Sequence, residues 1–345
     1  MDDSDIRILA VGTALPGPAV DNATLSRRFN MGLAWEQWID TFVGTRARHF
    51  AFDLDTGKIE YTLADLGEEA GSHALAAAGI AAADVDLVVM GTSSPDQLMP
   101  ATVNMIADRL GIDNVASYQL QSGCTGAVQA LDVAHHALST GRFRTALVIG
   151  GDSCAKHFDP DAGFRRMAPA HMVNGVLFGD GAGAAVLSRE PVPTAPAIRH
   201  TMVRLCGLNR PPGQIVEWFG AADRGSDRPG VSEDYQAIFD AVPVMAAETF
   251  RELLDALGWE ADDIDYLLPP QLSGQMTERI TKAMDAPEAH QISCVHEIGN
   301  TGNAVPFFQL ERLLPGMTSG DRAVAVSIES SKWIKAGFAL EKTSR

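Results

Sequence analysis

A cysteine surrounded by small residues is the strongest chemical feature of this sequence. Cys124 lies in the segment 121–127, which reads QSGCTGA, between an apolar strand-like stretch and a helix-like stretch. A helix N-terminus supplies partial positive charge and free N–H groups, which favour a thiolate. The N–H of Cys124 can also face the oxyanion of a tetrahedral intermediate. The pattern indicates a nucleophile for thioester chemistry, with a buried structural thiol as the alternative.

The other cysteines do not share this setting. Cys154, Cys206 and Cys294 are widely spaced, and the chain has no CxxC pair. This spacing fits neither a zinc site nor a disulfide framework, so we expect reduced structural thiols, no metal and no cofactor. Residues 151–154 read GDSC, and the missing second glycine makes a hydrolase nucleophile elbow a weak alternative.

The elements that must position Cys124 alternate between two periodicities. Short apolar runs predict strands, and stretches with helical spacing that stop at a glycine predict helices. Alternation of this kind favours an α/β layered fold. In the first half the predicted strands are 6–11, 86–90, 145–150 and 183–187, and the predicted helices are 63–78, 101–110 and 124–140.

The second half repeats a phrase of the first. Residues 82–89 read AADVDLVV and residues 261–268 read ADDIDYLL, so Asp86 and Asp265 correspond at an offset of 179 residues. Each phrase follows a predicted helix. A Pro-rich passage at 191–196 has the composition of a linker. We therefore expect two similar halves, 1–190 with Cys124 and 191–345.

Bulk composition excludes several classes of protein. The chain has 345 residues and a net charge of −17, which disfavours nucleic acid and anionic membranes as partners. No apolar run approaches the ~18 residues that a membrane span needs. The acidic N-terminus lacks the features of a signal peptide. We expect a cytoplasmic protein that binds neither nucleic acid nor membranes.

These motifs together resemble β-ketoacyl-acyl-carrier-protein synthase III and its relatives in the thiolase superfamily. The similarity runs from about Ile6 to Leu340. The blocks that carry it are Trp38-Ile39, GTRAR at 44–48, SPD at 94–96, MPAT at 99–102, the Cys124 segment, LFGDGAGA at 177–184 and GNTGNA at 299–304.

The resemblance implies a five-layered αβαβα thiolase-like fold and a homodimer whose strands pair through the run 114–121. It places Cys124 at the base of a tunnel. It also implies a ping-pong acyltransferase of the EC 2.3.1 type, in which an acyl-CoA or acyl-carrier-protein thioester acylates Cys124 and a second substrate takes the acyl group.

One expected catalytic residue is missing. The family uses a Cys–His–Asn triad, and its histidine sits in a Pro-His-Gln block that here reads Pro269-Pro270-Gln271. Asn300 occupies the asparagine position. Histidine and asparagine stabilise the enolate formed by decarboxylation, and loss of one such donor typically costs about 10²–10³ in rate. We therefore expect decarboxylative condensation to be slow.

Two candidates could supply the missing proton chemistry. His296 lies four residues before Asn300 and is a possible replacement base, with Glu297 to orient it. The alternative is that His296 is an ordinary histidine. In that case Asn300 with Gln271, or the acceptor substrate itself, would carry the proton.

Substrate binding also departs from the family pattern. Trp38 is kept as a possible adenine-stacking residue, but Phe42 stands where the family often has a CoA-phosphate arginine. Lys156 is a candidate phosphate contact and Lys332 a candidate contact to substrate charge. The family's glycine-rich turn near the oxyanion hole here reads ESSKWIK, at 329–335. We expect weakened CoA recognition.

Two functions remain in competition. The first is a ketoacyl synthase III-like acyltransferase of specialised, polyketide-type metabolism, which passes the acyl group from Cys124 to carbon, oxygen or nitrogen of a small-molecule acceptor. The second is a non-catalytic or assisting subunit paired with an active ketosynthase homologue. The retained cysteine favours the enzyme.

Overall fold

Ten strands lie in one sheet in the computed structural model, which describes residues 5–154, 169–218, 223 and 230–343. Their order is β12-β11-β13-β14-β8-β1-β7-β6-β4-β5. The first half of the chain supplies β1 (Arg7–Ala14), β4 (Leu87–Gly91), β5 (Ala116–Leu120), β6 (Thr145–Asp152) and β7 (Gly181–Ser188). The second half supplies β8 (Ala197–Leu205), β11 (Tyr266–Leu268), β12 (His290–Gln291), β13 (Arg322–Glu329) and β14 (Ile334–Glu341).

The two halves have the same topology. Numbered along the chain within each half, the five strands lie side by side in the order 1-5-4-2-3. In both halves the second strand pairs in parallel with the third and fourth, and the fifth pairs antiparallel with the fourth and first. The repeated phrase found in the sequence forms the turn before, and the start of, the equivalent strands β4 and β11. The expected boundary at residue 190 falls between β7 and β8.

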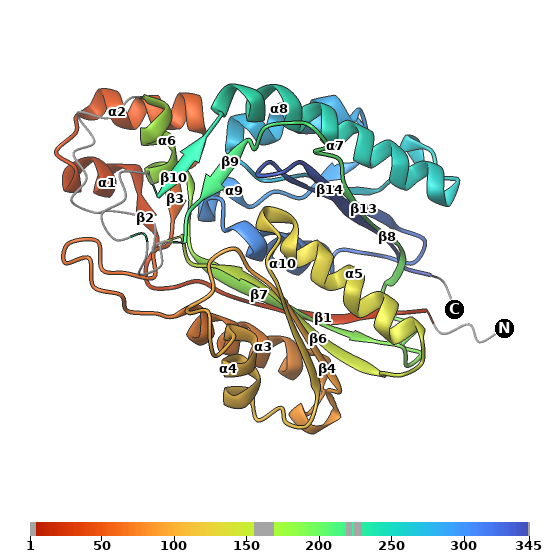
Figure 1. Cartoon of the computed structure of the whole chain (residues 1–345). Helices are drawn as coiled ribbons and strands as arrows, with labels where there is room; N and C mark the ends of the chain where they lie inside the picture. The colour runs from red at the N-terminus through yellow and green to blue at the C-terminus, as the bar shows by residue number, and fades with distance from the viewer. Residues whose placement is uncertain (1–4, 155–168, 219–222, 224–229, 344–345) are drawn as a thin grey trace.

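Helices complete five layers (Figure 1). Outer helices α3 (Leu63–Ala78) and α4 (Thr102–Leu110) cover the sheet of the first half, while α7 (Tyr235–Leu257) and α8 (Gly274–Met284) cover that of the second. Between the five strands of the first half and the five strands of the second lie α5 (Gly126–Ser139) and α10 (Val305–Leu313), and α5 contacts strands of both halves. The αβαβα fold that the sequence resemblance implies is confirmed.

Helix α5 can lie between the two halves of the sheet because its inner face is small and apolar. In α5 this face includes Ala127, Ala130 and Ala134, each with no exposed surface. A Cβ at Gly91 of β4 would overlap the backbone of Gly126, so only glycine lets the start of α5 rest on that strand. This close approach fixes the position of the turn just before α5.

The remaining short elements gather at one end of the layers. They are α1 (Asn22–Arg28), α2 (Leu33–Trp38), α6 (Pro169–Leu177), α9 (Val295–Ile298) and the strand pairs β2 (Val20–Asp21) with β3 (Ala47–Arg48) and β9 (Gln214–Val216) with β10 (Val231–Glu233). The fully buried Arg48 joins several of them, donating to the Val176 carbonyl at 2.6 Å and to Asn22 Oδ1 at 2.7 Å. Of the described helices, none is long and apolar enough to cross a membrane.

The seam between the halves is narrow. Strand β1 meets β8 through a single residue pair, Arg7 with Ala197. Two backbone hydrogen bonds flank it, from Ile8 N to the Pro196 carbonyl at 3.1 Å and from Ile198 N to the Ile6 carbonyl at 2.8 Å. The seam therefore needs support from side chains and from the central helices.

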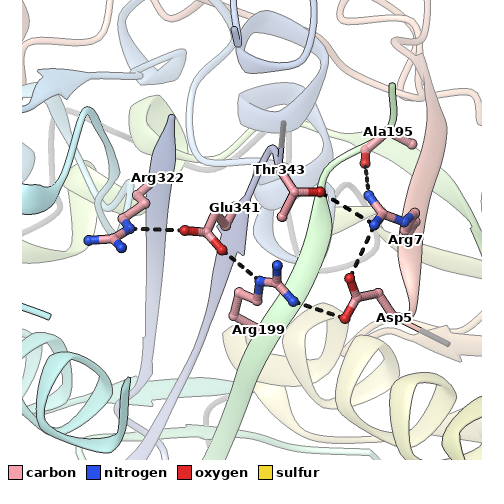
Figure 2. Close-up of polar contacts among 7 residues, drawn as sticks. All are labelled: Asp5, Arg7, Ala195, Arg199, Arg322, Glu341 and Thr343. Atoms are coloured by element: carbon pink, nitrogen blue, oxygen red, sulfur yellow. Dashed lines mark hydrogen bonds and ion pairs between the residues drawn. The ribbon is translucent and has the colours of Figure 1, made fainter. Parts of the chain in front are cut away.

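A chain of ion pairs crosses this seam (Figure 2). Arg322 pairs with Glu341 at 3.2 Å, Glu341 with Arg199 at 2.9 Å, Arg199 with Asp5 at 2.9 Å, and Asp5 with Arg7 at 3.1 Å. These groups are partly exposed, so each pair contributes only about 0.2–1 kcal/mol. Their arrangement joins Asp5, two residues before β1, to three strands of the second half.

We predict a homodimer that pairs through β5. This strand pairs with β4 on one side and forms the edge of the sheet in the described chain, with Tyr118 48% exposed at its centre. An open strand edge is a template for pairing with another chain. Light scattering at micromolar concentration should give about twice 36.8 kDa. Tyr118→Glu, which places a charge at that edge, should shift the mass toward the monomer. A monomeric wild type would contradict the prediction.

Candidate active site

Cys124 lies in a tight 3₁₀ turn, Gly123–Thr125, between the end of β5 and the start of α5. The turn begins at Gly123, whose φ of +56° is readily adopted by glycine. The Ser327 hydroxyl, from β13 of the other half, donates to the Cys124 carbonyl at 3.0 Å. The predicted helix therefore begins two residues after the cysteine, and both halves hold the turn.

One cavity brings together several of the residues that the sequence singled out. Cys124 lines it with Asn300, Pro270 and Gln271, and Ser327 also lines it. Pro270 stands where the resemblance places a histidine, and proline has neither a side-chain donor nor an N–H. The cavity thus has a thiol and an amide, but no imidazole at this position.

Asn300 is held so that one side of its amide remains free. Its backbone bridges to Phe178, with Asn300 N donating to the Leu177 carbonyl at 2.9 Å and Gly179 N donating to the Asn300 carbonyl at 3.0 Å. Its Oδ1 accepts from Gly302 N at 3.0 Å. No described residue accepts from Nδ2, so this group can donate to an oxygen bound in the cavity.

A buried carboxylate organises the surrounding loops. Asp152, the last residue of β6, accepts hydrogen bonds from Ser93 N at 2.7 Å, from Ser94 Oγ at 2.9 Å and from Asn303 N at 2.9 Å. Asn303 Nδ2 also donates to it at 2.8 Å, and Asn303 Oδ1 accepts from Ala127 N at 2.8 Å. Burial raises the pKa of Asp152, against the hydrogen bonds from Asn303, Ser93 and Ser94 that lower it. Through Asn303 this carboxylate reaches the first turn of α5.

A second carboxylate has the matching place in the other half. Glu329, the last residue of β13, accepts hydrogen bonds from Cys124 N and, at 2.6 Å, from Ser331 N. Asp152 and Glu329 each end the fourth strand of their half. They contact Asn303 and Cys124 respectively, which are separated by the same 179 residues as the repeated phrase.

The glycines that precede Cys124 and Asn303 show the same symmetry. Gly123 and Gly302 both have φ +56°. A Cβ at Gly123 would collide with the Glu329 carboxylate, and a Cβ at Gly302 would collide with the Asp152 carboxylate. Each turn therefore needs glycine both for its backbone conformation and for the close approach of a carboxylate.

These contacts overturn two expectations about the nucleophile. Burial raises the pKa of the Cys124 thiol well above its ordinary value, and the negative charges of Glu329 and Asp152 act in the same direction. The expected helix-lowered thiolate is wrong because these effects favour the neutral thiol. The Cys124 N–H, expected to face an oxyanion, donates to Glu329 instead because a carboxylate has replaced a residue of the glycine-rich turn.

His296 does not reach the cavity. Its Nδ1 lies 2.5 Å from the Gly44 carbonyl oxygen, and its ring would contact a Cβ placed at Gly274. Glu297, expected to orient it, lies 3.4 Å from Arg312 instead. Among the described residues, those that line the cavity with Cys124 do not include His296. Proximity in sequence to Asn300 did not translate into proximity in space, because α9 directs this side chain toward the Gly44 turn.

Gln271 lines the cavity but uses its amide elsewhere. Its Oε1 accepts from Ser293 Oγ at 2.8 Å, Cys294 N at 2.9 Å and Val295 N at 3.0 Å, and its Nε2 donates to the Pro269 carbonyl at 3.3 Å. These bonds satisfy N–H groups at the start of α9 and give Gln271 an anchoring position.

The candidate substrate contacts are scattered. Trp38 is half-buried at the end of α2. Lys332 is exposed, and its Nζ donates to the Arg210 carbonyl at 2.6 Å. Lys156 lies outside the described residues. The sequence analysis missed Glu329 as a site residue, although the altered glycine-rich turn and the 179-residue offset both pointed to its neighbourhood.

Comparisons with known proteins agree with this geometry. Residues 118–203 match the sequence model of 3-oxoacyl-[acyl-carrier-protein] synthase III, and residues 254–330 match that of its C-terminal part. The chain is 29% identical over 303 residues to the β-ketoacyl-[acyl-carrier-protein] synthase III of Neisseria meningitidis serogroup B, covering 86% of this chain and 87% of that protein.

Solved structures give the same result. The tetronic acid condensing enzyme AbyA1 superimposes with a TM-score of 0.95 and 56% identity, covering 97% of this chain and 99% of that one. The 3-oxoacyl-(acyl carrier protein) synthase III of Pseudomonas aeruginosa PAO1 has a TM-score of 0.84 and 26% identity, over 99% of both chains. The priming β-ketosynthase of the R1128 polyketide pathway has a TM-score of 0.82 and 25% identity, over 99% of this chain and 97% of that one.

The fold and the cysteine cavity define a thiolase-fold protein of the condensing-enzyme class. Within that class, the chain is a 3-oxoacyl-[acyl-carrier-protein] synthase III-like member of the thiolase superfamily, as the resemblance in sequence indicated.

We predict that Asp152→Asn destabilises the fold. The new amide places N–H donors against existing donors, and hydrogen bonds to a charged group contribute about 1.5–3 kcal/mol each. Loss of one or two should lower the unfolding free energy by about 3 kcal/mol. Urea unfolding monitored by circular dichroism measures this. Asp262→Asn, at an exposed position, is the matched control and should change the free energy by less than about 0.5 kcal/mol. Equal stability of the two variants would contradict the prediction.

Proposed function

We propose that this chain is a condensing acyltransferase of tetronic acid assembly. It takes an acyl group from an acyl-carrier-protein or acyl-CoA thioester onto Cys124 and transfers the group to a small-molecule acceptor. The observation that supports this most directly is a cavity holding Cys124 and Asn300, in a chain 56% identical along its length to a tetronic acid condensing enzyme.

The chemistry of the product class suits this cavity. A tetronic acid is a five-membered enol lactone, so its ring can be assembled from two acyl units by one C–C and one C–O bond. A carbon flanked by two carbonyls can attack a thioester without decarboxylation, and a hydroxyl can close the lactone. Neither step requires a histidine that stabilises the enolate from decarboxylation. Pro270 is compatible with this chemistry.

The described residues have separate parts in the proposed reaction. Cys124 Sγ attacks the donor thioester and holds the acyl group. Asn300 Nδ2, which has no acceptor among the described residues, donates to an acyl or acceptor oxygen. Pro269, Pro270 and Val305 give part of the cavity wall an apolar lining, which excludes water that would hydrolyse the thioester.

A carrier-bound donor is favoured over free CoA. Phe42, at the position where the resemblance places a phosphate-binding arginine, is 67% exposed and carries no charge. The remaining CoA candidate in the described chain, Trp38, offers stacking but no charge for a phosphate. An acyl group delivered on a carrier protein depends less on contacts to the nucleotide.

We predict that Cys124 is the acylation site. Incubation with acetoacetyl-N-acetylcysteamine should add one acyl mass to the intact wild-type protein, and Cys124→Ala should abolish both this adduct and turnover. Cys154→Ala, at a neighbouring thiol, is the control and should retain the adduct. Intact-protein mass spectrometry measures both. A wild type without an adduct would instead favour the assisting-subunit function, and full turnover by Cys124→Ala would refute the assignment.

We also predict slow decarboxylation of malonyl-carrier protein. Pro270 supplies no hydrogen bond to the enolate, which should lower the rate by about 10²–10³ relative to a homologue with histidine there. Release of CO₂ by purified protein measures it. Pro270→His restores a donor at this position and should accelerate the release. Native rates equal to those of the histidine-containing homologue would contradict the prediction.

A further inference from the structure

Glu329 contacts the residue that carries the proposed nucleophile. Its carboxylate accepts from the Cys124 backbone N–H, and its negative charge helps to raise the pKa of the Cys124 thiol. The side chain reaches the turn from the end of β13 and is 1% exposed. The chemistry set out so far assigns this contact no part.

Comparison with the other half shows what is unusual about Glu329. Asp152, its counterpart, accepts hydrogen bonds from backbone and side-chain groups of the Thr92–Ser94 loop and of Asn303, so its oxygens are fully used. Glu329 accepts from only two backbone N–H groups in the described chain, those of Cys124 and Ser331. A carboxylate has about four acceptor sites. The oxygens of Asp152 are all used in structural hydrogen bonds, whereas the oxygens of Glu329 still have acceptor sites that can take up a proton.

We propose that Glu329 is a catalytic residue that accepts the Cys124 thiol proton when the donor thioester acylates the cysteine. This inference rests on the proposed function and deepens it, because it names the base of the same site. Glu329, at the end of β13, then has the role of general base for which His296 was the candidate from sequence.

The step balances in atoms and charge. Cys124 Sγ forms a bond to the acyl carbon while its proton moves to a Glu329 oxygen. The tetrahedral intermediate then expels the carrier sulfur as the C–S bond breaks. The departing thiolate takes the proton back from Glu329, leaving acyl-Cys124, the free carrier thiol and an ionised carboxylate. In the second half-reaction the carboxylate accepts the proton of the attacking hydroxyl or carbon acid and returns it to the Cys124 sulfur.

The electrostatic setting makes such a base necessary. Among the described residues, the charged or titratable groups that act on the Cys124 thiol are Glu329 from β13, Asp152 from β6 and Cys154 just after β6. None is a cation. A thiol in this setting is protonated at neutral pH, so its proton must leave during the attack rather than before it.

Two reactions of Cys124 separate a catalytic role from a structural one. The first is acylation by acetoacetyl-N-acetylcysteamine, followed by intact-protein mass spectrometry. The second is alkylation by iodoacetamide, which requires the thiolate. Its leaving group, iodide, takes up no proton, so a residue that returns a proton to the leaving group does not assist this reaction. In Glu329→Gln we expect acylation to slow by about 10²-fold or more, the usual contribution of a positioned base. The alkylation midpoint should move to lower pH, because a negative charge that holds the thiol neutral is gone.

His296→Ala is the matched comparison and should be acylated at the wild-type rate. A folded Glu329→Gln protein acylated at the wild-type rate would overturn the role of Glu329 while leaving the proposed function intact. A wild type that forms no adduct would overturn the proposed function and this inference with it. Opposite shifts of acylation and alkylation are the supporting result, since a merely structural residue would change both reactions in the same direction.

The wild-type protein provides a test even if Glu329→Gln does not fold. Acylation should proceed at pH values where iodoacetamide does not yet react, because the base removes the proton within the attack. If the two reactions have the same pH profile, prior ionisation of the thiol limits both. That result would overturn the proposal.

Discussion

The buried Asp152 carboxylate is the interaction on which the rest of this site depends. It ends β6, accepts hydrogen bonds from the loop after β4, and holds Asn303 in the turn before α10. Asn303 in turn caps Ala127 in the first turn of α5, directly beyond Cys124. A charge without water must be compensated by such donors. Because Asp152 needs these donors, the end of β6, the loop after β4 and the turn before α10 are held together. Through Asn303 they also hold the start of α5, and with it the Cys124 turn.

Duplication explains why a second carboxylate lies at the nucleophile. The two halves share strand order, the φ +56° glycine before each central helix, and an acidic residue at the end of the fourth strand. In one half the turn carries Asn303 and the carboxylate is saturated with structural hydrogen bonds. In the other the turn carries Cys124, and Glu329 contacts a reactive thiol. The same geometry thus serves rigidity on one side of the molecule and proton chemistry on the other.

The sequence predicted more of the fold than of the site. Alternating periodicities, the 179-residue repeat and the family motifs were sufficient for the layered architecture, and the motifs also brought Cys124 and Asn300 to one cavity. The state of the thiol was not predictable, because its neighbour Glu329 is 205 residues away in sequence and only the packing of β13 against the Cys124 turn brings them together. His296 failed for the converse reason: it is near Asn300 in sequence, but the short helix α9 directs it to Gly44.

The reactive pair is divided between the two halves, with Cys124 before β6 and Glu329 at the end of β13. In the sheet, the two halves are joined by a single residue pair, Arg7 of β1 with Ala197 of β8. On the ribosome, the cysteine emerges some two hundred residues ahead of its carboxylate. A nascent first half therefore displays a thiol with no partner to deprotonate it, and docking of the last two strands completes the chemistry. Under the proposed role of Glu329, Cys124 can therefore be acylated only after the second half has folded.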